Sequence, residues 1–88
     1  MDVPAPTPAS ELLDEIDRLL DAAISQQRAK VLALARRILP HVGPEEVLNP
    51  DGFSELAGDG PFNYEDGLLA GLIAAQMAIR AQLRRGTG

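Results

Sequence analysis

Residues 10–39 contain neither glycine nor proline, and this absence constrains the fold more than any other feature of the sequence. Apolar residues recur through the stretch at a spacing near 3.6, which is typical of an amphipathic helix. They are Leu13, Ile16, Leu20, Ile24, Val31, Leu34 and Ile38. Pro40 disfavours helical geometry at the preceding residue. The pattern predicts one helix over 10–39, capped at its start by Thr7, with Pro8 in the first turn, or by Ser10.

Three further segments follow from composition. Residues 1–9 are rich in proline and alanine, and we expect a disordered tail there, with a second short tail at 86–88. Residues 40–63 are rich in glycine and proline. We expect this connector to hold one short helix at 43–48 and a turn at 49–52, and to cap one end of the helices through Phe53, Leu56 and Phe62. A last helix is predicted over 64–85, with Asn63 as its cap and Gly86 beyond its end.

Both predicted long helices begin acidic and end basic. The first has Asp14 and Asp17 early and Arg36 and Arg37 late, and the last runs from Glu65 and Asp66 to Arg84 and Arg85. This order complements the dipole of each helix, and it also favours an antiparallel pair in which acidic halves lie beside basic halves. The sequence therefore predicts an all-α fold, an antiparallel hairpin of two long helices with a short helical connector.

The last helix is apolar nearly all round, which is typical of a helix that is buried on more than one side. One side is bulky and consists of Leu69, Leu72, Ile73, Met77, Ile79 and Leu83. The other side, here called the small-residue face, consists of Gly67, Ala70, Gly71, Ala74, Ala75, Ala78 and Ala81. It would allow another backbone to approach closely. The alternative is that this face packs on the first helix within a monomer.

We expect the hairpin to associate into a homodimeric helical bundle, because one hairpin of 88 residues leaves much apolar surface in water. The candidate interface residues are Gly67, Gly71, Ala74, Ala75, Ala78, Leu72, Met77, Gln27 and Gln76. If Leu39 and Tyr64 are level, Gln27 and Gln76 are level too. We hypothesise that these two amides pair and set the register, as a core Asn does in coiled coils; alternatively, both are half-exposed and unrelated.

Several functional classes lack support in the sequence. The net charge of −5, with only three aromatic residues and no tryptophan, argues against nucleic-acid binding. The longest apolar run, over 67–83, includes Gln76 and Arg80 and is too short for a membrane span. The start of the chain does not have a signal peptide's pattern, so a cytoplasmic location is expected. There is no cysteine, and His41 is expected to be a cation near a helix end. No enzyme activity, metal or cofactor is expected.

The sequence therefore predicts a small interaction module, such as an adaptor, an assembly factor or a regulatory subunit. Its partner would be a second copy of itself or another helical protein, and the acidic connector is a candidate recognition surface. The alternative is a small-ligand-binding protein. In that case Met77, Phe53 and Phe62 would line an apolar cavity between the helices and Gln76 would supply the polar contact.

Overall fold

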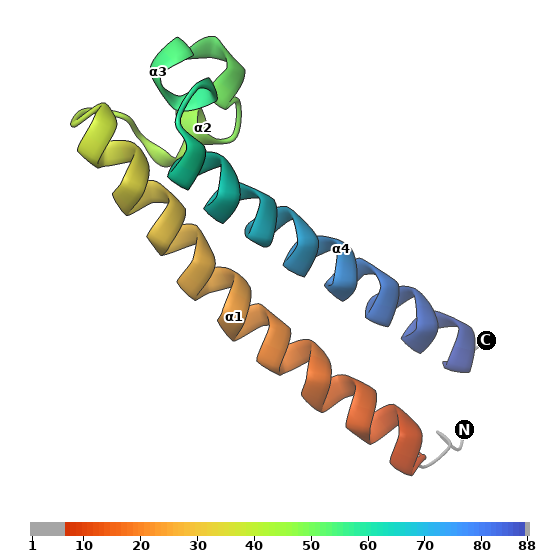
Figure 1. Cartoon of the computed structure of the whole chain (residues 1–88). Coiled ribbons are helices and arrows are strands. Elements are labelled where there is room, and N and C mark those ends of the chain that lie inside the picture. Colours follow the sequence, from red (N-terminus) through yellow and green to blue (C-terminus); the bar gives the residue numbers. More distant parts are fainter. Residues whose placement is uncertain (1–6, 88) are drawn as a thin grey trace.

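The computed structural model describes residues 7–87, all in helices and the short segments that join them (Figure 1). The long helices are α1 (Pro8–Ile38) and α4 (Gly60–Thr87). Between them lie α2 (Pro44–Val47), the 3-10 turn η1 (Pro50–Gly52) and α3 (Ser54–Ala57). The two long helices run antiparallel, so that the start of α1 and the end of α4 lie at the same end of the hairpin (Figure 1). The predicted helical hairpin with a short helical connector is confirmed. Residues 1–6 and 88 of the expected tails lie outside the described residues.

The start of α1 is set by Thr7, one of the two caps considered. The Thr7 hydroxyl accepts a hydrogen bond from the Ser10 backbone N–H at 3.1 Å, and Pro8 occupies the first turn. Pro8 and Ala9 therefore belong to the helix and not to the tail. At the other end Leu39 has extended backbone angles, as expected before Pro40. Arg36, and not His41, donates a side-chain hydrogen bond at this end, from Nε to the Val42 carbonyl oxygen at 3.2 Å.

The expected start of the last helix was wrong by one turn. Helix α4 begins at Gly60, because the Asp59 carboxylate accepts a hydrogen bond from the Phe62 backbone N–H at 2.8 Å and so caps the helix. Asn63 lies inside the first turn, where its side-chain amide donates to the Ala57 carbonyl oxygen at 2.8 Å. Asp59 followed by Pro61 was the signal in the sequence. The helix also continues past Arg85 to Thr87.

The enclosed core lies at the connector end of the hairpin. It is built by α1, the connector and α4 together, from the buried residues Val31, Ala35, Val42, Val47, Leu56 and Phe62. Leu56 and Phe62 have no exposed surface at all. The connector therefore caps this end of the hairpin as expected, with α2 and α3 beyond the start of α4 (Figure 1) and in contact with α1. Phe53 packs against this cluster but remains half-buried.

The remainder of the hairpin encloses much less. Among the described residues outside that cluster, only Ile24 and Gln76 are buried. Leucines and isoleucines of the facing stripes, such as Leu20, Leu72 and Ile79, are only half-buried. Two helices in one layer shield each other along a single line and leave both sides of that line open. Most of the length of the molecule thus has a seam between its helices but no closed interior.

We expect Phe62→Ala to lower the free energy of unfolding by about 3–5 kcal/mol, because it leaves a cavity in the only closed core of the described chain. Leu12→Ala is the control: Leu12 is 62% exposed, so its loss should change stability by less than about 0.5 kcal/mol. Urea unfolding followed by helicity measures both. Equal losses for the two variants would show that the connector end is not the stabilising core.

Candidate interaction surface

Polar contacts between α1 and α4 set how the two helices are placed along each other. Near the connector, Glu65 accepts hydrogen bonds from Gln27 Nε2 at 2.7 Å and forms an ion pair with Lys30 Nζ at 2.9 Å. Towards the chain ends, Arg80 Nε forms an ion pair with Asp17 at 3.0 Å. An acid of one helix thus meets a base of the other at both places. The antiparallel arrangement expected from the charge order is confirmed.

The expected pairing of Gln27 with Gln76 was wrong. The buried Gln76 donates its side-chain N–H to the Asp21 carboxylate at 2.7 Å, while Gln27 bonds to Glu65, about three helical turns before Gln76. Each amide therefore binds a carboxylate on the opposite helix. The prediction assumed that Leu39 and Tyr64 are level. In the structure α1 extends past the start of α4, and its last turns pack against Phe62 and the connector.

The environment of Glu65 favours its charged form. Hydrogen bonds from Lys30 first, and from the Gln27 amide second, hold the pKa of the Glu65 carboxyl below its ordinary value. The Glu65 side chain is only 12% exposed, whereas the Lys30 side chain is 59% exposed. One carboxylate, fixed by two donors from α1, therefore fastens the start of α4 to the middle of α1.

The small-residue face points away from α1. Gly67, Gly71, Ala74, Ala75 and Ala78 are all exposed. A methyl group added at Gly67 or Gly71 would meet no atom within 4 Å. The alternative that this face packs on the first helix within a monomer is therefore wrong. The bulky side packs on α1 instead, with one exception: Met77 is 66% exposed.

The remaining interface candidates occupy different places. Leu72 and Gln27 are half-buried and Gln76 is buried along the seam between α1 and α4, so they lie inside the hairpin and not on its outer surface. The exposed candidates all lie on α4. The structure thus brings the glycines, the alanines and Met77 together on one accessible helix surface and separates them from the glutamines.

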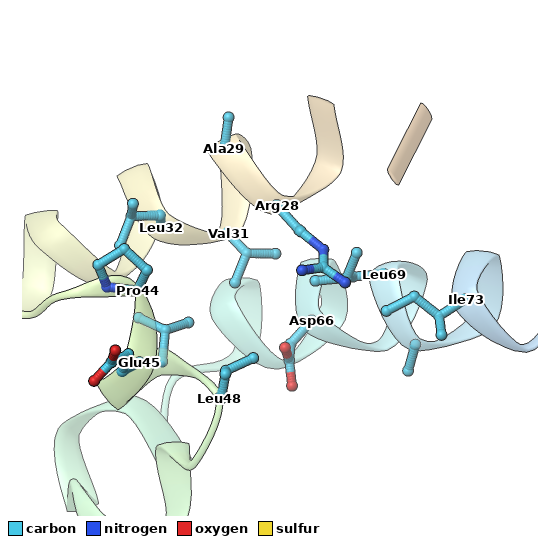
Figure 2. A pocket seen from close by; sticks show the side chains of 12 residues that line it. Arg28, Ala29, Val31, Leu32, Pro44, Glu45, Leu48, Asp66, Leu69 and Ile73 are labelled. Carbon is cyan, nitrogen blue, oxygen red and sulfur yellow. The ribbon is translucent and has the colours of Figure 1, made fainter. Parts of the chain in front are cut away.

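An open apolar groove lies between α1, α2 and α4 (Figure 2). It has a volume of about 380 Å³. Its lining consists of Arg28, Ala29, Val31, Leu32, Pro44, Glu45, Val47, Leu48, Asp66, Leu69, Ala70 and Ile73. Leu48 is 78% exposed at its edge. Sequence reasoning missed this groove, because it is assembled from three segments that are far apart in the chain. The one signal in the sequence was Leu48, an apolar residue directly after the short helix α2 that is left exposed.

The cavity proposed for a small ligand does not form as expected. Phe62 is sealed in the core, Met77 points outward, and Gln76 is engaged with Asp21, so the four expected residues line no common cavity in the described part of the chain. Among the side chains that the structure describes, no three from His, Cys, Asp or Glu are placed to hold a metal ion. Within residues 7–87, no helix is both long enough and apolar enough to cross a membrane.

Comparison with known proteins adds no assignment: the chain matches no protein-family model, no curated protein and no solved structure.

The Glu65 contacts predict a pH-dependent stability. The pKa of Glu65 is lowered on folding. Its contribution to stability is therefore present above the pKa that Glu65 has in the unfolded chain, and is lost as the pH falls through the pKa that it has in the folded chain. We expect Glu65→Gln to lower the free energy of unfolding at neutral pH and to lower it less near pH ~2.5. Urea unfolding at both pH values measures this, with Asp14→Asn, an exposed acid of α1, as the control. An equal loss at both pH values would contradict a charge effect.

The open space at Gly71 predicts a gain in stability. We expect Gly71→Ala to raise the free energy of unfolding of the isolated chain by about 0.5–1 kcal/mol, since alanine restricts the unfolded state and meets no neighbour. The measurement is urea unfolding at the lowest practical protein concentration. Gly58→Ala is the contrasting variant, because its added methyl would lie 3.3 Å from the Ser54 carbonyl oxygen. A loss of stability in Gly71→Ala would show that another part of the protein covers the small-residue face at this position.

Proposed function

We propose that this chain is a protein–protein interaction module that acts as a homodimeric helical bundle. The observation that carries the proposal is the size of its surface. The chain exposes 6373 Å², whereas a compact monomer of 9.4 kDa exposes roughly 5,000 Å². The excess is roughly 1,400 Å², and each partner of a standard interface buries about 800 Å². An interface of standard size would therefore take up somewhat more than half of that excess.

The shape of the molecule supports the same proposal. Its radius of gyration is 17.2 Å, against about 12 Å for a compact chain of this length. It measures 55 × 22 × 17 Å, so it is a rod only one helix pair thick. A second hairpin laid along this rod would give the two layers around one core that helical domains usually have. The exposed side chains of Leu48 and Met77 would then have an apolar surface to pack against.

Within this proposal the chain serves as an adaptor, an assembly factor or a small regulatory subunit. The connector offers the recognition surface, since Glu45, Glu46 and Glu55 are exposed there with no basic residue between them. A basic or amphipathic target segment is the matching partner chemistry.

One observation favours a second candidate function, the binding of a small apolar ligand. The groove between α1, α2 and α4 has about 380 Å³, which is within the range of ligand sites, and it is lined mainly by apolar side chains. A metabolite that raised the melting temperature without changing the mass in solution would support this candidate over the first.

The test of the first candidate is the solution mass measured by light scattering over a wide dilution series, with helicity followed in parallel. We expect a dimer whose helix content falls as it dissociates, because the half-open seam between α1 and α4 loses its cover. A monomer that kept its full helix content at every concentration would contradict the homodimer.

A further inference from the structure

The side of α4 that borders the groove carries a regular row of accessible residues, here called the outer stripe. Gly67, Ala70, Ala74, Met77 and Ala81 recur at alternating steps of three and four residues, and all but the half-buried Ala81 are exposed. This spacing is that of the contact positions in helices that pack with interlocking side chains. The outer stripe borders the groove, because Ala70 also belongs to the groove lining.

We propose that a second copy of this chain covers the outer stripe, with the two α4 helices antiparallel and Met77 of each copy seated in the groove of the other. This inference rests on the proposed homodimer and adds the surface through which the two copies meet and their relative orientation. With a two-fold axis near Ala74, Met77 of one copy lies opposite Ala70 of the other, and Gly67 lies opposite Ala81. The contact is the same in both directions, as a closed dimer requires.

Size complementarity supports this placement. The outer stripe has only one large side chain, Met77, and the groove has room for a side chain among Leu48, Leu69 and Ile73 (Figure 2). The four small residues of the outer stripe allow the two α4 axes to come close enough for Met77 of one copy to reach the groove of the other. Methionine is flexible and fills irregular apolar spaces well.

Charge supports the antiparallel direction. Helix α4 has Asp66 near its start and the basic residues Arg84 and Arg85 in its last turn. An antiparallel pair places the basic end of each helix near Asp66 of the other copy and aligns the helix dipoles favourably. A parallel pair would bring the two basic ends together.

The surface on the opposite flank is a weaker candidate for the same role. Leu12 and Leu19 are each 62% exposed on α1, but neither belongs to the lining of the groove between α1, α2 and α4. If Leu19 entered the groove of a second copy, the contact would not be reciprocal, because the two surfaces lie on opposite flanks of the hairpin. Such a contact would build an open chain of molecules instead of a dimer.

The chain has no cysteine, so single-cysteine variants report on one position each. Ala74→Cys places a thiol beside the proposed two-fold axis, where the Cβ atoms of the two copies come within the reach of a disulfide. Ala22→Cys is the matched control, since Ala22 is an exposed alanine in the middle of α1. Under mild oxidation at a concentration where the chain is dimeric, we expect Ala74→Cys to cross-link at least about tenfold faster than Ala22→Cys.

A charge at Met77 gives a second measurement. Met77→Glu should keep its helix content, because Met77 is 66% exposed, but should weaken dimerisation by at least about tenfold, since the charge would be buried in a groove that already holds Glu45 and Asp66. Leu19→Glu, at a similarly exposed site, should leave the mass unchanged. A dimer that resists Met77→Glu and cross-links slowly at residue 74 would overturn this face while the homodimer stands. A wild-type chain that is monomeric throughout would instead overturn the homodimer, and this inference with it.

Discussion

The structure depends on one constraint: two helices in a single layer can enclose a core only where a third element covers them. The connector supplies that cover at one end, where Leu56 and Phe62 are fully buried beside Val31 and Ala35. Over the rest of the hairpin the facing leucines and isoleucines are half-buried. Stability is therefore concentrated at the connector, and the remaining length holds together by the seam and by cross-helix polar contacts.

Those polar contacts decide the register of the hairpin. An apolar seam of two long helices tolerates several relative positions, because one leucine can replace another along it. A carboxylate with specific donors is more selective. Glu65 with Lys30 and Gln27, and Gln76 with Asp21, match only in one placement of α4 on α1. The side-chain amides of the buried Gln76 and the half-buried Gln27 each bind a carboxylate of the opposite helix, and these hydrogen bonds offset the cost of burying the amides.

The outward face of α4 follows from the same register. Once the bulky side of α4 faces α1, the glycines and alanines must face away from it, with open space above Gly67 and Gly71. Glycine within a helix costs stability relative to alanine, and no atom of the described chain lies within 4 Å of the methyl group that alanine would add at either position. Ala70 belongs both to the small-residue face and to the lining of the adjoining apolar groove, which is why a second copy accounts for the two features together.

The sequence by itself determined the helices and their direction. The period of the apolar residues, the absence of glycine and proline over 10–39, Pro40 and the charge order are local signals, and each acts within a few turns of helix. Only the tertiary structure decided the register, the start of α4 at Gly60 and the groove. These depend on which side chains meet across the seam and on how far α1 runs past α4. Leu48, Leu32 and Ile73 share one groove because three distant segments converge, and no spacing within the sequence encodes that convergence.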